Sequence, residues 1–357
     1  MDTADLPPII PFSELRSRGW SRAAVEQALD DGDLVWLRRG WYAVPRPSID
    51  GPAWEQARAE HLHRLDLELR RRPGHAASHT SAALVHGLSL SISPEAPLDL
   101  TAVRRSQTSR RDPGLTLHKS ASDLAGVDHV GGRLVTTLPR TVADFLRMRT
   151  LPHGVALLDD ALRRQLIDTV GVRRELDRQV RWRGRPRALG VLALADPARE
   201  SWAESYTFAN LHLRGIPLPL HQVEILDEDG TFLGRVDGLW PEVGVVGECD
   251  GQGKYFIGPE GRPPEQVVLG NLAAERARQG AMEARGLTFV RWSPSEVRDD
   301  PDEVVGRIRS AFYAGVPTRF TGYAVWRGEA RRLPFEAGTP SVEADTLRHR
   351  RTRRRPR

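Results

Sequence analysis

The sequence is poor in cysteine and in lysine. It contains one cysteine, Cys249, and two lysines, Lys119 and Lys254, beside fifty arginines. A single cysteine excludes an internal disulfide framework and any zinc site built from several cysteines, which fits a reducing compartment. No stretch approaches the roughly eighteen apolar residues of a membrane span, and the start MDTADLPPIIP has neither a basic nor a long apolar region. We therefore expect a cytoplasmic protein without a membrane partner.

The formal net charge of +5 arises at the carboxyl terminus. Seven arginines lie between Arg348 and Arg357, and subtracting their charges leaves −2 for the rest of the chain. Residues 336–357 are predicted to form a basic disordered tail that can bind polyanions without specificity. An Arg-rich terminus is equally compatible with no such role. The net charge alone therefore says little about a nucleic-acid partner.

Residues 1–47 read as helix, turn, helix and β-hairpin. Ser21 can cap the second helix, residues 22–31, and Gly32 can end it. Two apolar runs on either side of the turn Arg38-Arg39-Gly40 predict the hairpin. This order of elements is typical of a winged helix-turn-helix.

The run GDLVWLRRGWYAV in this region resembles the amino-terminal domain of the AbiEi antitoxin family of type IV toxin–antitoxin systems. The resemblance implies DNA as a partner and a nucleotidyltransferase-like toxin as a second one. It implies that the second helix enters the major groove with Arg22 and Gln27, and that Arg38 and Arg39 meet the DNA from the wing tip. Small winged domains also serve protein contacts, and their basic tips are then merely solvated.

Residues 54–150 are predicted to be an α+β middle domain, with a helix over 54–71 and strands at 98–103 and 115–119. The runs SHTSAALVHGL and TTLPRTVADFLR in it also resemble AbiEi-like proteins. Its histidines lack cysteine partners and a His-Glu-x-x-His spacing, so we predict structural roles for them. Asp144 can pair with Arg140, four residues earlier on a helix. Residues 151–197 read as an Arg-rich helical connector.

Three carboxylates lie in the segment FLGRVDGLWPEVGVVGECDGQGKY. Two β-rich runs joined by a short turn predict a hairpin with Asp237 on the first arm and Glu248 and Asp250 on the second. The two-residue spacing places Glu248 and Asp250 on one face and points Cys249 into the core. Such close carboxylates require a proton or a cation among them, and oxygen ligands suit Mg²⁺ or Mn²⁺.

The order of motifs over residues 198–314 resembles the PD-(D/E)XK nucleases, in particular a domain related to very-short-patch-repair endonucleases. The resemblance is carried by SWAESYTFANLHLRG, GRVDGLWPE, ECDGQGKY, a following helix and a strand ending in VRW. It implies a restriction-endonuclease-like α/β domain over residues 198–316. It further implies that Asp237 and Glu248 hold the metal ion, with Asp250 either a further ligand or an adaptation at the position of the missing lysine. Glu204 would complete the shell or orient the attacking water.

One position departs from the superfamily pattern, because Asp250 stands where a lysine is usual. Lys254 follows in a Gly-rich turn and is a candidate to stabilise charge on the phosphate, since lysine can lose its proton when desolvated. A surface lysine in a turn is an equally good interpretation. Gln252 lies beside the acids with an open role.

The helix after this turn carries three further candidates. Glu275 is predicted to pair with Lys254 or with an arginine. Arg276 and Arg278 are two residues apart and do not share a helix face, so at most one is expected to reach the DNA.

These patterns together predict an α+β multidomain, DNA-directed protein. We expect a winged helix-turn-helix, an α+β middle region and a carboxyl-terminal PD-(D/E)XK domain that hydrolyses phosphodiester bonds in phage defence or DNA repair. The alternative is an AbiEi-type antitoxin or transcriptional repressor whose nuclease fold is inactive. The sequence does not predict the oligomeric state.

Overall fold

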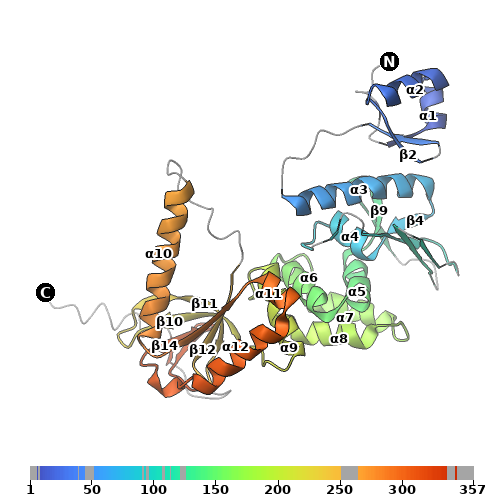
Figure 1. Ribbon diagram of the computed structural model, residues 1–357. Helices are drawn as coiled ribbons and strands as arrows, with labels where there is room; N and C mark the ends of the chain where they lie inside the picture. Colours follow the sequence, from blue (N-terminus) through green and yellow to red (C-terminus); the bar gives the residue numbers. More distant parts are fainter. Residues whose placement is uncertain are drawn as a thin grey trace. The chain divides into compact units, whose positions relative to one another are not determined.

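The computed structural model shows a chain of mixed α and β structure that divides into two compact units (Figure 1). The first unit is Met1–Met148 with Val170–Arg183, and the second is Arg149–Thr169 with Gly184–Arg357. The strands of the described residues form three sheets. The structure describes residues 6, 9–38, 40–44, 52–90, 92–93, 96–106, 109–112, 114–120, 126–250, 264–335 and 342–343. Over these ranges, no helix combines the length and the apolar character that a membrane span needs.

The first unit begins with two short helices and an antiparallel sheet of order β1-β3-β2. The hydroxyl of Ser21 accepts a 3.1 Å hydrogen bond from the Ala24 N–H and so caps the second helix, as predicted. The predicted hairpin is also present, whereas the first strand was not foreseen. The elements are β1 (Ile9–Pro11), α1 (Phe12–Ser17), α2 (Arg22–Asp30), β2 (Val35–Arg38) and β3 (Trp41–Ala43). Their core consists of Ile10, Leu15, Trp20, Val25, Ala28 and Leu34.

The rest of the first unit is a sheet of order β6-β7-β5-β4-β9-β8 with helices packed on it. The predicted helix over 54–71 and the strands near 98–103 and 115–119 are confirmed, and the other strands are additions. The strands are β4 (His75–Ala77), β5 (Leu98–Ala102), β6 (Arg110–Asp112), β7 (Leu115–His118), β8 (Val127–Val130) and β9 (Arg133–Thr136). The helices are α3 (Ala53–Arg71), α4 (His79–Val85), α5 (Leu138–Met148) and α7 (Thr169–Arg178).

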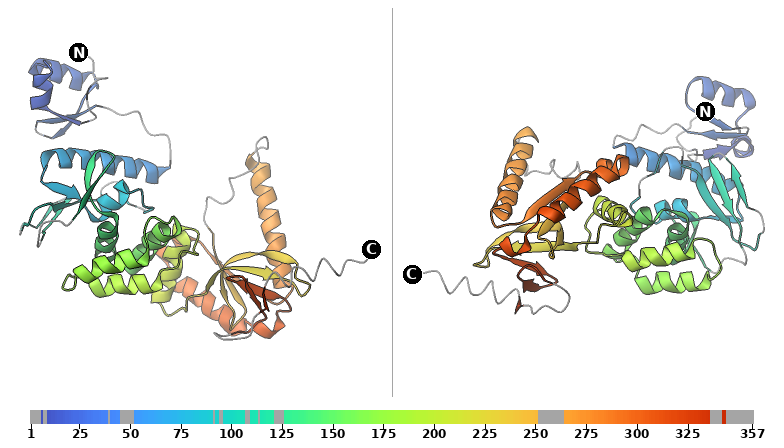
Figure 2. Two further views of the ribbon diagram at one scale, coloured as in Figure 1. Left: turned by 180° about the vertical axis from the view of Figure 1, so that it is seen from behind. Right: turned by 60° about the horizontal axis from the view of Figure 1, so that its bottom comes forward.

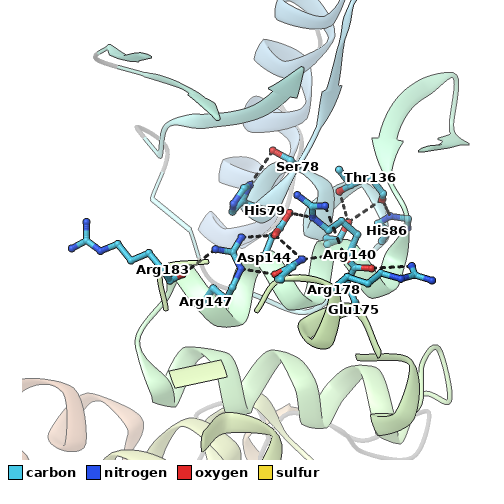
Figure 3. A network of polar contacts seen from close by, with 12 residues as sticks. Ser78, His79, His86, Thr136, Arg140, Asp144, Arg147, Glu175, Arg178 and Arg183 are labelled. Carbon is cyan, nitrogen blue, oxygen red and sulfur yellow. Dashed lines mark hydrogen bonds and ion pairs between the residues drawn. The ribbon is translucent and has the colours of Figure 1, made fainter. Parts of the chain in front are cut away.

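A buried polar network centred on Asp144 of α5 reaches Gln179, just after α7, and includes His79 of α4 as a neighbouring titratable group (Figure 3). The fully buried Asp144 accepts 2.6 Å hydrogen bonds from both Arg140 and Arg147, which confirms the predicted pair with Arg140. Burial alone would raise the pKa of Asp144, but the charges of His79, Arg140 and Arg147 hold it below its usual value. Hydrogen bonds in this network tie α5 to Gln179, the residue that follows α7, while His79 of α4 acts on Asp144 through its charge.

The histidines of this unit that carry described hydrogen bonds have structural partners. His61 contacts the Ser81 hydroxyl at 2.9 Å, and the Nε2–H of His86 donates a 2.8 Å hydrogen bond to the Thr136 carbonyl oxygen. His79 contacts the Ser78 hydroxyl at 3.0 Å and stacks on His118, with ring centroids 3.8 Å apart. Ser78 is the N-cap residue of α4, although its side chain makes no cap hydrogen bond.

The second unit contains a mixed sheet of order β13-β12-β11-β10-β14-β15-β16. Its central strands β10, β11 and β12 are antiparallel neighbours, and β12 pairs parallel with β13. The strands are β10 (Leu220–Leu226), β11 (Phe232–Trp240), β12 (Val245–Cys249), β13 (Thr288–Trp292), β14 (Tyr323–Trp326), β15 (Glu329–Arg331) and β16 (Val342–Glu343). The helices are α6 (Leu151–Arg163), α8 (Arg185–Leu194), α9 (Trp202–Leu213), α10 (Pro264–Glu283), α11 (Pro294–Asp299), α12 (Pro301–Ala314) and η1 (Pro317–Arg319).

Helices cover both faces of this sheet (Figure 2). On one face, Phe208 of α9 and Ile308 of α12 pack with the sheet tryptophans Trp240 and Trp292. On the other face, Met282 of α10 packs on strands β10 to β12. Each face of the central strands is therefore buried in its own hydrophobic cluster, which fixes the direction of every side chain along β11 and β12.

Two predicted segments differ from the structure. The segment predicted as a connector, residues 151–197, is divided, because α7 belongs to the first unit and α6 and α8 belong to the second. Within the predicted tail, Val342–Glu343 form β16 and pair with β15. The Arg-rich end of that tail lies outside the described residues.

Candidate metal centre

The predicted hairpin exists as β11 and β12. Its register pairs Gly238 with Gly247 and Trp240 with Val245. The backbone N–H of Cys249 donates a 3.0 Å hydrogen bond to a carboxylate oxygen of Asp237, which ties this side chain to the end of β12. The Cys249 side chain is buried in the cluster that contains Phe208 and Trp292, as the alternation predicted.

The backbone of β12 has no room for a side chain at Gly247. A Cβ there would lie 2.6 Å from the Trp292 ring and 2.8 Å from the Trp240 ring. The two indoles therefore rest against the strand one residue before Glu248. This close packing sets the position from which Glu248 projects to the opposite face.

Three carboxylates converge at the end of this strand. An oxygen of Glu248, one of Asp250 and one of Glu275 all lie within 4.8 Å of one another. Glu248 is buried, and the other two are partly exposed. The shared face of Glu248 and Asp250 is therefore confirmed, and the group is able to hold a metal ion. The third member comes from α10 and not from Asp237, which the sequence had assigned to the ligand set.

Arg291, to which the sequence assigned no role, lies in the middle of this cluster. It stands opposite Glu248 in the parallel register of β12 and β13. Its guanidinium donates to both oxygens of Asp250, at 2.9 and 2.5 Å, and it also hydrogen-bonds Glu275. It further donates to the Gln279 side chain at 3.0 Å and lies 3.5 Å from Glu248. Glu275 thus pairs with an arginine, one of the two partners predicted for it.

The charges of this group shift the pKa of Glu248. Burial, and next the neighbouring Asp237 carboxylate, raise the pKa of Glu248 to about 7, while Arg291 and Arg278 act in the opposite direction. Hydrogen bonds to Asp250 raise the pKa of Arg291 further above its usual range, so the guanidinium remains charged. The centre therefore combines a permanent cation with a carboxyl group that exchanges its proton near neutral pH.

Glu204 lies at the start of α9 and is not part of the three-carboxylate cluster. One of its oxygens accepts a 2.8 Å hydrogen bond from the Ser201 hydroxyl. The other accepts 3.0 Å hydrogen bonds from the Glu200 N–H and the Gln222 amide. The Ser201 hydroxyl in turn accepts a hydrogen bond from the Glu204 N–H. The N–H groups of Glu200 and Glu204 at the start of α9 therefore both have an acceptor. The Glu204 carboxylate is therefore engaged in capping.

The remaining candidates near the acids have different surroundings. Lys254 and Gln252 lie outside the described residues. Arg276 is exposed on α10, whereas Arg278 lies over β11, where a Cβ at Gly234 would meet its Cδ at 2.5 Å. The charge of Arg278 acts to lower the pKa of Glu248.

The candidates for DNA contact in the first unit lie on the surface where they are described. Arg22 is exposed at the start of α2, 3.7 Å from Glu26, and the Gln27 amide donates to Asp31 at 2.8 Å. Arg38 belongs to β2 by its backbone, but its side chain and the whole of Arg39 lie outside the described residues. An exposed aromatic side chain, Trp36, lies on the same strand and was not singled out from the sequence.

The chain is similar to two proteins of Mycobacterium tuberculosis. These are uncharacterized protein MT2308 of strain CDC 1551 and uncharacterized protein Rv2248 of strain H37Rv. Each is 26% identical over 289 residues, which cover 81% of this chain and 96% of the relative. No model of a known protein family matches the chain. The names of the relatives state no activity, so the function has to be argued from the site.

Proposed function

We propose that the second unit is a metal-dependent phosphodiesterase of the PD-(D/E)XK type and that the first unit directs it to DNA. The observation that supports this most is the convergence of Glu248, Asp250 and Glu275 on the face of β12 and β13 that α10 covers. The motifs GRVDGLWPE, ECDGQGKY and VRW begin on β11, β12 and β13, which are neighbours in the sheet, and Glu248 lies near the end of β12.

The donor set fits a hard divalent cation. All three possible ligands are carboxylates, so every ligand atom is an oxygen. One oxygen each of Glu248, Asp250 and Glu275 lies within 4.8 Å of the other two. Mg²⁺ and Mn²⁺ prefer such ligands, and either would stabilise the negative charge that develops on a phosphate under attack. Asp237, held by the Cys249 N–H, would contribute its charge from the neighbouring strand.

The protein's own groups set the charge of the centre. Without a metal ion, burial and next the Asp237 carboxylate raise the pKa of Glu248 to about 7, so a divalent cation would compete with a proton for this carboxylate. Arg278, whose charge already acts on Glu248, would meet the phosphate next to the scissile one. Glu204 would act indirectly, by holding the start of α9 against the sheet.

The first unit would bring the DNA. The order of α1, α2, β2 and β3 is the order of a winged helix-turn-helix, in which α2 would enter the major groove. Arg22 and Gln27 are exposed on that helix, and their present partners Glu26 and Asp31 are exposed as well. Such surface pairs cost little to break, so both side chains are available to bases or phosphates.

One observation favours a second function. Arg291 already pairs with all three carboxylates, which is compatible with an inactive nuclease fold that keeps only its shape. The chain would then be an AbiEi-type antitoxin or transcriptional repressor that binds its own promoter and a nucleotidyltransferase-like toxin. Its winged domain would carry out the same DNA binding in either case.

Cleavage of supercoiled and linear DNA by the full chain distinguishes the two functions. We expect nicking that requires Mg²⁺ or Mn²⁺ and that is lost in Glu248→Gln and Asp250→Asn. Glu242→Gln is the matched control, because Glu242 is an exposed acid at the turn of the same hairpin. Metal-dependent nicking that persists in both site variants would contradict the proposed centre. DNA binding without cleavage by the wild-type chain would support the repressor.

A further inference from the structure

The position of Arg291 is defined by two elements of the second unit. Among the described strands, β13 lies at the end of the sheet, so one side of it has no strand neighbour. Arg291 is flanked by the buried Val290 and Trp292, yet its own side chain is 26% exposed. The guanidinium therefore lies at the boundary between the acids and solvent.

The same carboxylate oxygens would serve the guanidinium and a divalent cation. Arg291 donates to both oxygens of Asp250, at 2.9 and 2.5 Å, and to Glu275. Mg²⁺ and Mn²⁺ bind carboxylate oxygens at about 2.0–2.2 Å, so such an ion at these oxygens would lie against the guanidinium. Two cations at that separation repel one another strongly.

We propose that Arg291 is an internal counter-ion that closes the metal centre and has to leave the three carboxylates before a divalent cation enters. This inference rests on the proposed function. It adds that Arg291 keeps the three carboxylates close together and blocks metal binding until it leaves. Without a metal ion, three acids within 4.8 Å would repel one another, and Arg291 holds them together. The three carboxylate ligands are therefore already close together when a divalent cation arrives, but the cation binds them only when the guanidinium is displaced.

The planar fork of arginine explains why this residue serves as the counter-ion. One guanidinium engages Asp250 with two N–H groups, Glu275 with a third donor site and Gln279 through its remaining nitrogen. A lysine ammonium has three donors on one nitrogen and would not reproduce the bidentate contact with both oxygens of Asp250. Gln279 is the one uncharged partner among these contacts, and it anchors the guanidinium to α10 at 3.0 Å.

Calorimetric titration of the full-length chain with Mn²⁺ tests the exchange. Relative to wild type, we expect Arg291→Met to bind Mn²⁺ at least about tenfold more tightly, because the competing charge is gone. Arg291→Lys, which keeps the charge but loses the fork, should lie between the two. Arg298→Met is the control, because it removes an exposed arginine of the same unit that pairs with Asp299 and not with the cluster. Its Mn²⁺ affinity should equal that of wild type.

A second variant guards against loss of folding. Gln279→Ala removes only the anchor of the guanidinium on α10 and leaves every charge in place. We expect it to fold and to bind Mn²⁺ about two- to fivefold more tightly than wild type, in line with the loss of one hydrogen bond. Far-ultraviolet circular dichroism of each variant establishes that the fold is retained.

The outcomes separate this inference from the proposed function. If wild type binds Mn²⁺ and the folded Arg291→Met and Gln279→Ala variants bind it no more tightly, the counter-ion role is overturned while the metal centre stands. If Arg291→Met binds Mn²⁺ and wild type does not, the counter-ion role is supported and the metal-dependent function of the natural chain is contradicted. If none of these proteins binds Mn²⁺, both are overturned.

Discussion

The backbone N–H of Cys249 donates a 3.0 Å hydrogen bond to the carboxylate of Asp237. This contact crosses the hairpin beside Glu248 and gives Asp237 two roles. Its oxygen accepts from a buried N–H, and its charge raises the pKa of Glu248. The two roles are separable by substitution, because asparagine keeps the acceptor oxygen and removes the charge.

Asp237→Ala should therefore be less stable than Asp237→Asn. Both variants lose the carboxylate charge, but only alanine leaves the Cys249 N–H without this acceptor, at a cost of about 1–2 kcal/mol. Urea denaturation of the two variants at the same pH measures the difference. Equal free energies of unfolding would show that the hydrogen bond contributes nothing to stability. In both variants the pKa of Glu248 should fall, which carboxyl carbon shifts can report.

Substitution of Gly247 should destabilise the fold and shift Glu248, because the Trp240 and Trp292 rings pack directly against this position. In Gly247→Ala the new methyl group would lie 2.6 Å from Trp292 and 2.8 Å from Trp240, so β12 or the indoles have to move. We expect a loss of about 1–3 kcal/mol and weaker divalent-cation binding, since Glu248 is the next residue. Gly280→Ala is the control, because nothing lies within 4 Å of that position on α10. It should leave stability unchanged or raise it slightly. Equal melting temperatures for the two variants would contradict the packing argument.

The hairpin was predictable from the sequence because its pattern is local. Alternation along a strand decides which side chains share a face, so the common face of Glu248 and Asp250 followed from their spacing. The cap of α9 was equally local, since Ser201 and Glu204 have the spacing of a capping box. Assigning Glu204 to the metal shell passed over that signal, and its contacts in the structure are those of a cap.

The cluster itself was not predictable in the same way. Glu275 and Arg291 come from a helix and a strand that follow the hairpin, and only the packing of α10 and the parallel pairing of β13 bring them to Glu248. One signal for Arg291 was present, because a single arginine stands between the apolar residues Val290 and Trp292 of β13. A charged residue at such a position is rarely buried without a partner, and the acids of the neighbouring strand are its partners here.

The first unit should lose stability in mild acid through His79. Burial lowers the pKa of His79 from 6.5 to about 4, with Asp144 acting in the opposite direction and His118 adding to the shift. The unfolded chain therefore binds the proton on His79 more readily than the folded chain does. The neutral imidazole's contribution to stability is fully present above pH 6.5, and it is lost as the pH falls from 6.5 through 4. A shift of this size corresponds to at most about 3 kcal/mol.

His79→Asn is the variant that tests this dependence. Asparagine does not titrate, tolerates the positive φ of 47° at this position, and offers an oxygen in place of Nδ1 to the Ser78 hydroxyl. Scanning calorimetry between pH 7 and pH 4.5 should show a smaller decrease of the melting temperature in the variant than in wild type. Parallel decreases would assign the acid sensitivity to other groups.

DNA binding by α2 should depend on Arg22. Arg22→Gln removes an exposed charge at the start of the helix that would enter the major groove, and its only described ion pair is a surface contact with Glu26. We expect weaker binding of duplex DNA in gel-shift titrations and a salt dependence whose slope falls by about 1, as for the loss of one phosphate contact. Arg16→Gln is the control, because Arg16 is an exposed arginine on α1. Equal losses in the two variants would show that the DNA responds to overall charge and not to α2.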